Sequence, residues 1–274
     1  MLRLLSIEFH KLKNNKAAKV LSLIYFLLFS AIALFASIRF NFGSIDFRLA
    51  DQGIFNFPYI WHFNAYFVAF LKLFLAIVIV SMVSSEYTNR TLKQNLIDGL
   101  SKKEFILSKF YGVIAFALAS TLLLFIVSLT LGLIFSDYDE IGIIFSDLEY
   151  ILAYFLKLVG FFSMCLFFGI LLKRSAFALG FLFLIWVFEG IVQLLVKFQA
   201  ESLDFILNFL PLQAMSNLIV EPLTRLGIVK STAVQLNSEF TKSYDVEWSA
   251  VLIVLGWSFI FIYSSWKLLQ KRDL

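Results

Sequence analysis

The stretch SSEYTNRTLKQNLIDGLSKKEFILSKF, residues 84–110, is polar and basic, yet it lies between two long apolar segments. Residues 63–83 precede it and residues 110–135 follow it. Each segment is long enough to cross a bilayer, which takes about 20 mostly apolar residues. The polar stretch must therefore lie outside the membrane, and it carries helix start and stop signals that a simple connecting loop does not need.

The composition is that of an integral membrane protein. Of the 274 residues, 61% are hydrophobic and 15% are charged, whereas soluble domains carry about 25% charged residues. We expect an all-α, polytopic membrane protein in which residues 1–274 form one transmembrane domain. Six transmembrane helices are expected, at residues 20–38, 63–83, 110–135, 148–172, 176–196 and 248–268.

Several kinds of chemical site are not expected. Cys165 is the only cysteine, and the two histidines, His10 and His62, are far apart in the sequence. A disulfide, a metal site and a Ser-His-Asp triad are therefore not predicted. The G-x-x-x-x-G-K-[ST] motif that binds ATP phosphates is missing from the sequence. We expect no catalytic residues, cofactor, metal or nucleic-acid partner for this chain.

The Lys and Arg residues are distributed unequally between the two sides of the predicted membrane. Fifteen of the 23 fall in residues 1–19, in residues 86–109, in the link at 173–174 and in the C-terminal tail. Cytoplasmic loops carry an excess of Lys and Arg. We therefore expect both termini and residues 86–109 to be cytoplasmic.

The first nineteen residues predict an amphipathic helix at the membrane surface. Leu2, Leu5, Phe9 and Leu12 recur at helical spacing, with Lys and Arg on the other faces. Such a helix would lie in the inner interface with its apolar side toward the lipid. The alternative is a disordered basic tail.

Residues 86–109 predict two short helices joined at a glycine. Thr88 or Asn89 can cap a helix that runs to Asp98, and Gly99 is placed to end it. Ser101 and Glu104 match the S-x-x-E capping box, which opens a second helix that continues into the third span. We call residues 86–109 the elbow.

An apolar stripe gives the elbow a possible binding face. Leu92, Leu96 and Leu100 recur at four-residue spacing, which places them on one side of a helix. The alternative is a solvated basic loop that lies loosely on anionic headgroups. Since such a loop would need neither the caps nor the stripe, we favour a docking element.

The architecture and the elbow resemble a permease subunit of the type-2 ABC transporters. In that family the second span ends in a Glu, followed by a Gly-Thr-type helix start, a Pro-x-Ser-Arg break and a helix that ends in Lys. This chain has Glu86, then NRTL at 89–92, GLSK at 99–102 and FILSK at 105–109. The departures are Arg90 for Gly, Gly99 for Pro and Lys102 for Arg. The basic tail WKLLQKRDL, residues 266–274, also resembles the tails of these subunits.

The resemblance implies a role for the elbow as a coupling helix. It would dock on a separate ABC ATPase subunit, which binds the ATP, and the chain would pair with a second permease subunit, identical or homologous. The implied location is the bacterial inner membrane, and the implied function is ATP-driven export of an amphipathic lipid, peptide or hydrophobic toxin. The candidate docking residues are Glu86, Arg90, Thr91, Leu92, Leu96, Gly99, Leu100, Ser101, Glu104 and Lys109.

Three charges fall inside the predicted spans: Lys72, Lys157 and Glu189. A charge at such a depth is costly unless it is compensated. The fourth and fifth spans are joined by a short turn, so Lys157 and Glu189 lie at a similar depth and could pair. We favour such a structural pair, with Lys72 extending toward the membrane surface. The alternative is a polar step in a substrate path.

The segment at residues 197–247 is expected on the outer side of the membrane. Residues 205–215 are apolar but too short to span, and they could form re-entrant or interfacial helices broken at Pro211. In the resembled family this region caps the outer mouth. A lid without a gating role is equally compatible with the residues.

Two other functions compete with the permease interpretation. An ion-coupled secondary transporter would show repeated, broken spans with several charges at the membrane midplane, and the sequence has no visible internal repeat. An intramembrane enzyme would need clustered acidic residues or histidines within its spans. Glu189 is the only acidic residue in the interior of a predicted span.

Overall fold

The computed structural model describes residues 2–35, 39–42, 45–48, 53–199, 204–225 and 243–272. This part of the chain is helical, as predicted, apart from one hairpin of two short antiparallel strands, β1 (Arg39–Phe42) and β2 (Ile45–Arg48). The hairpin was not expected from the sequence. It joins the first long helix to the second.

The helices follow the predicted order. They are α1 (Leu2–Asn14), α2 (Lys16–Phe35), α3 (Tyr59–Val68), α4 (Lys72–Thr88), α5 (Thr91–Ile97), α6 (Lys102–Phe135), α7 (Ile141–Ile144), α8 (Glu149–Leu172), α9 (Ser175–Gln199), α10 (Asp204–Leu207), α11 (Pro211–Asn217) and α13 (Trp248–Gln270). Two 3₁₀ turns accompany them, η2 (Ala69–Leu71) and η4 (Leu223–Arg225).

Within the described residues, five helical segments are long and apolar enough to cross a membrane: Tyr59–Thr88, Lys102–Phe135, Ile141–Leu172, Ser175–Phe198 and Trp248–Gln270. They correspond to the second to sixth predicted spans. Helix α2 covers most of the first predicted span, 20–38, whose residues 36–38 lie outside the described part of the chain. The predicted total of six spans therefore stays a prediction.

Helix α8 forms the centre of the bundle, where α13, α4, α6 and α9 pack against it. In the segment Ile141–Leu172, which contains α8, 72% of the most apolar stretch is buried within the protein. Gly160 allows the close approach of α13 and α11, because a Cβ at this position would lie 2.9 Å from Val254 and 3.2 Å from Met215. Small residues permit such close packing of membrane helices.

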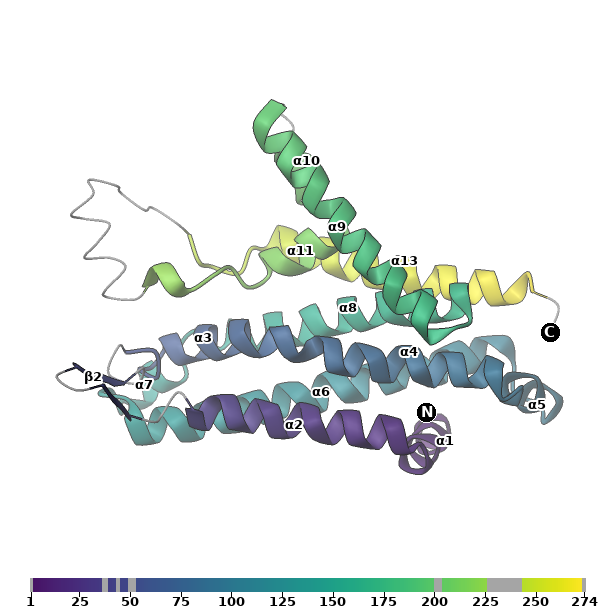
Figure 1. Ribbon diagram of the computed structural model, residues 1–274, viewed down its shortest axis with the longest axis horizontal. Helices are drawn as coiled ribbons and strands as arrows, with labels where there is room; N and C mark the ends of the chain where they lie inside the picture. The colour runs from purple at the N-terminus through teal and green to yellow at the C-terminus, as the bar shows by residue number, and fades with distance from the viewer. Residues whose placement is uncertain are drawn as a thin grey trace.

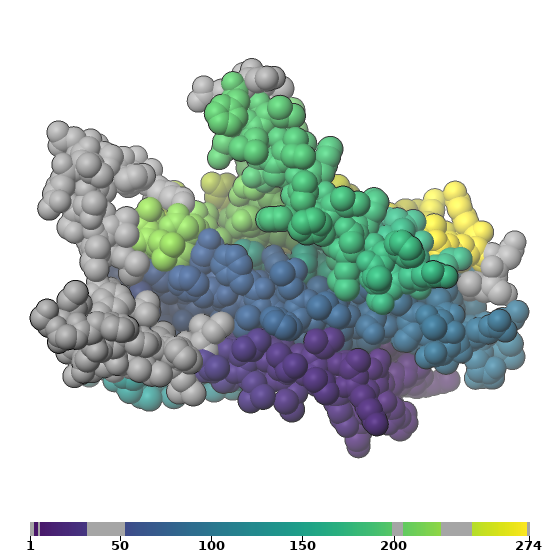
Figure 2. Space-filling model, in the orientation of Figure 1, coloured from purple at the N-terminus to yellow at the C-terminus, as the bar shows by residue number. Residues whose placement is uncertain are grey.

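Helix α9 projects away from the bundle toward its C-terminal end, as the ribbon and the space-filling view show (Figures 1 and 2). Only 6% of the most apolar stretch of this helix is buried within the protein. Exposed aromatic and aliphatic side chains follow the helix along its length, among them Phe183, Trp186, Phe188 and Leu195. This helix therefore presents apolar surface that the described part of the chain does not cover.

The two ends of the bundle carry different segments (Figure 1). Helix α1, the short helix α5 and the C-terminal end of α13 lie at one end, which we call the elbow end. The β-hairpin and α7 lie at the opposite end, which we call the far end. The elements with the most Lys and Arg thus gather at the elbow end.

Candidate functional site

The elbow is built from the end of α4, all of α5 and the start of α6. Helix α4 continues to Thr88, and Arg90, in the left-handed conformation with φ of 56°, precedes α5. The prediction that Thr88 or Asn89 caps this helix was therefore wrong. Arg90 makes the turn at a position where the resembled family often has Gly, the residue that adopts positive φ most readily.

Gly99 ends α5 as predicted. Its φ is 95°, and the two N–H groups that follow the helix donate back to it, Gly99 to the Leu96 carbonyl at 3.2 Å and Leu100 to the Asn95 carbonyl at 3.0 Å. This is the Schellman arrangement, which satisfies the last carbonyls of a helix. The chain is thereby held in a fixed turn between α5 and α6.

The predicted capping box is present at the start of α6. The Glu104 N–H donates to the Ser101 hydroxyl at 3.1 Å, and the Ser101 N–H donates to the Glu104 carboxylate at 2.9 Å. Helix α6 then runs without a break from Lys102 to Phe135. The end of the elbow and the apolar part of α6 that can cross a membrane therefore form one continuous helix.

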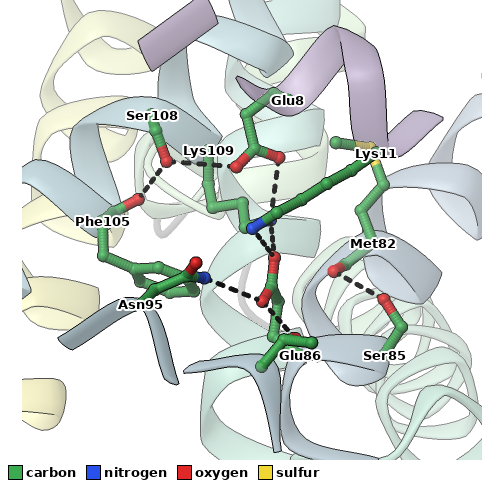
Figure 3. Close-up of polar contacts among 10 residues, drawn as sticks. Glu8, Lys11, Met82, Ser85, Glu86, Asn95, Phe105, Ser108 and Lys109 are labelled. Carbon is green, nitrogen blue, oxygen red and sulfur yellow. Dashed lines mark hydrogen bonds and ion pairs between the residues drawn. The ribbon is translucent and has the colours of Figure 1, made fainter. Parts of the chain in front are cut away.

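A buried ion-pair network lies behind the elbow (Figure 3). The Lys109 ammonium contacts the Glu86 carboxylate at 2.6 Å and the Glu8 carboxylate at 2.7 Å. Lys11 contacts the same Glu86 oxygen at 2.8 Å from a more exposed position. Glu8, Glu86 and Lys109 are each 3% exposed or less. The network therefore joins α1, α4 and α6.

Hydrogen bonds from uncharged side chains complete the network. Thr91 and Asn95 of α5 donate to the second oxygen of Glu86, and the Ser108 hydroxyl donates to Glu8 at 3.2 Å. Such bonds are needed for buried charges, because attraction between the charges alone rarely offsets the loss of hydration. Two carboxylates and two ammonium groups leave the cluster neutral. Helix α5 is thus tied to the bundle through Glu86.

Glu86 lies beyond residue 83, where the second predicted span ends. Burial alone would raise the pKa of the Glu86 carboxyl, but the Lys109 charge and the hydrogen bonds from Lys109, Lys11 and Thr91 together outweigh burial, and that pKa is lowered to about 2. Glu86 is therefore ionised at any physiological pH. Of the network residues, Glu86, Thr91 and Lys109 were candidates from the sequence, whereas Glu8, Lys11, Asn95 and Ser108 were missed. A usable signal existed, since Glu8 is the only acidic residue in the basic segment 1–19.

The apolar stripe of the elbow faces the protein rather than outward. Leu92 is 2% exposed, and Leu96 and Leu100 are partly buried against the main core. The expectation that this stripe faces a partner is therefore wrong for Leu92, because α5 uses the stripe to pack on the bundle. The exposed apolar side chain is Ile97, 69% accessible, with exposed Lys93 and Lys103 on the same elbow.

The C-terminal tail is attached to the same end of the bundle. The Arg272 guanidinium donates to the backbone carbonyls of Ile170 and Leu171, which belong to the last turn of α8. The Lys102 ammonium donates to the carbonyls of Gln270 and Arg272. The ends of α8 and α13 and the start of α6 are therefore joined at the elbow end.

The three charges within the spans do not form one cluster. Glu189 accepts hydrogen bonds from the backbone N–H groups of Leu212 at 3.1 Å and Gln213 at 3.0 Å, at the start of α11. The predicted ion pair between Lys157 and Glu189 is therefore not formed. The partly exposed Lys72 packs against α8, where its ammonium lies 4.5 Å from the centre of the Phe161 ring. No cluster of three or more potential metal ligands occurs among the residues that the structure describes.

Comparison with known proteins identifies the family. No curated protein sequence matches the chain. The family model for the ABC-2 family transporter protein matches residues 4–190, which include most of α1, the whole elbow and most of α9. This match covers more than half of the chain and contains every residue of the buried network. The protein therefore belongs to the ABC-2 transporter family, as a multi-pass membrane protein of the type-2 ABC permease class.

Proposed function

We propose that this chain is the membrane subunit of an ATP-driven exporter and that its elbow docks on a separate ABC ATPase. The observation that carries the proposal is the buried network of Glu8, Glu86 and Lys109. A segment that receives force from a partner has to be stiff. The network, the Schellman turn and the capping box give the elbow that stiffness.

The docking surface consists of the exposed side chains of the elbow. Ile97 supplies an apolar contact, and Arg90, Lys93 and Lys103 are exposed basic residues of the same elbow. Ser101 and Gly99 are exposed beside them. Glu86, Leu92 and Lys109 are buried, so they act by holding the elbow in place rather than by touching the ATPase. The ATPase face is expected to carry a small apolar pocket with acidic residues at its rim.

The exporter works as a dimer of permease subunits in a bacterial inner membrane, with both termini in the cytoplasm. The uncovered apolar surface of α9 supports a second permease subunit, and the gathering of basic segments at the elbow end supports the orientation. ATP-driven closure of two ATPases would press on both elbows and rock the attached helices α4 and α6. The 34 Phe residues of the chain fit an amphipathic substrate.

Photo-crosslinking tests the docking surface. A benzoylphenylalanine residue in place of Ile97 should crosslink the full-length permease, in cell membranes, to a protein that contains an ATP-binding P-loop. The matched control replaces Phe145, which is 50% exposed and lies near α7 at the far end. Mass spectrometry identifies the crosslinked protein. Crosslinking of the ATPase from position 145 but not from position 97 would refute the docking assignment.

A further inference from the structure

Two lysines within the predicted spans have no acidic partner. Lys72 lies at the start of α4 and Lys157 in α8, and among the described residues neither forms an ion pair. The buried Lys109 and Glu189, in contrast, are compensated. Lys109 has two carboxylates, and Glu189 has two backbone N–H groups. Lys72 and Lys157 therefore differ from these residues, because no acidic side chain of the described residues neutralises either ammonium group.

The two lysines belong to one polar cluster between α4 and α8. Lys157, Phe161 and Cys165 are spaced four residues apart, so they lie along one stripe of α8. The Lys72 ammonium lies over the Phe161 ring, 4.5 Å from its centre, and Phe161 is one helical turn from both Lys157 and Cys165. Lys157 is 5% exposed and lies about 12 Å along α8 from its first residue at 1.5 Å per residue. The cluster thus places two positive charges together at membrane depth.

The backbone is irregular at the same place. The α-helix of the second span is interrupted by the 3₁₀ turn η2, Ala69–Leu71, and Lys72 is the first residue after it. Short 3₁₀ stretches within helices often mark hinges, and interrupted membrane helices carry the binding sites of many transporters. Phe70 and Leu73, next to Lys72, are about 60% exposed and offer apolar surface.

Two ammonium groups at this depth repel each other and lose hydration, and an anion would relieve both effects. We propose that Lys72 and Lys157 form a binding site for the acidic headgroup, phosphate or carboxylate, of an amphipathic molecule. The headgroup contacts both ammonium groups, and the tail lies along the exposed apolar residues of α4. That this molecule is the exported substrate rests on the proposed function, whereas the binding itself does not.

Equilibrium binding of radiolabelled dodecyl phosphate to the full-length permease in maltoside micelles tests the site. We expect Lys72→Gln and Lys157→Gln each to weaken binding at least tenfold. Lys72→Arg should keep most of it because the charge remains. The matched control is Lys197→Gln, since Lys197 is exposed and lies near the end of α9. Unlabelled laurate and inorganic phosphate, added as competitors, show whether a carboxylate or a free anion suffices.

The outcomes are distinct. Competition by laurate but not by millimolar inorganic phosphate supports an amphiphile headgroup, and equal competition by inorganic phosphate supports a free anion at the same lysines. Equal binding by wild type, Lys72→Gln and Lys157→Gln would overturn the proposal, as would an equal loss in Lys197→Gln. Thermal unfolding of each variant provides a second measurement, because removing an unpaired buried charge should not lower the melting temperature. A large decrease in both variants would show that the lysines support the fold instead. The binding assay contains no ATPase. Headgroup binding can therefore fail while the crosslinking at Ile97 succeeds, and headgroup binding can succeed while the crosslinking fails.

Discussion

Replacing Lys109 by Met should be the most damaging single change in the buried network. The substitution strands Glu8, whose remaining partner is the Ser108 hydroxyl, and leaves Glu86 with Lys11 as its one charged partner, beside the hydrogen bonds from Thr91 and Asn95. Removing one partner of a buried ion pair typically costs about 3–5 kcal/mol. Lys11→Met should cost less than about 1 kcal/mol, because Lys11 is one-third exposed and exposed pairs contribute little.

The assay is the free energy of unfolding of the purified permease, measured by sodium dodecyl sulfate titration in mixed micelles. The exposed Lys103→Gln serves as the control. A double-mutant cycle adds Glu8→Gln, and we expect the double mutant to be more stable than the sum of the single effects by about 1.5–3 kcal/mol. Hydrogen exchange of α5 should rise in Lys109→Met. Equal stability of Lys109→Met and Lys103→Gln, or strict additivity of the cycle, would refute the reasoning.

Three further predictions follow from other contacts. In a Cys165→Ala background, a cysteine at the exposed Asp139 of the far end should react with an impermeant maleimide from outside the cell, whereas one at Ser101 should not; the reverse pattern would invert the orientation. Arg272→Ala should lower the free energy of unfolding by about 1–3 kcal/mol through the loss of two charge-assisted hydrogen bonds to α8, and Lys271→Ala, an exposed neighbour, should not. Glu189→Ala should increase hydrogen exchange at the start of α11, and adding Lys157→Leu should not restore protection, because the two charges are not paired; restoration would reinstate the ion pair.

The sequence predicts best what is decided by neighbours along the chain. Gly99 and the Ser101–Glu104 box were found because their partners lie within a few residues. Long apolar runs likewise predict helices that can cross a membrane, since length and composition suffice. These local signals located the elbow and five of the long helices.

The predictions that were wrong or missing concern the direction in which a side chain points and the element that it contacts. The spacing of Leu92, Leu96 and Leu100 defines a face of α5, but spacing does not say whether the bundle or a partner covers it. The similar depth of Lys157 and Glu189 in the membrane does not determine how either helix is rotated about its axis. In the structure Glu189 contacts the start of α11 instead of Lys157. Glu8 and Lys109 are 101 residues apart, so no local pattern links them.

That separation has a consequence for biogenesis. Glu8 leaves the ribosome 101 residues before Lys109, an interval of roughly 5–20 s at the usual 5–20 residues per second. During this time the nascent chain has made α2, α3 and α4, but the Glu8 carboxylate still lacks the ammonium group that neutralises it. Helix α1 can therefore take its final position only after the third span has begun to emerge. A stall in translation before Lys109 would therefore leave α1 without its partner on α6 and open to membrane quality-control proteases.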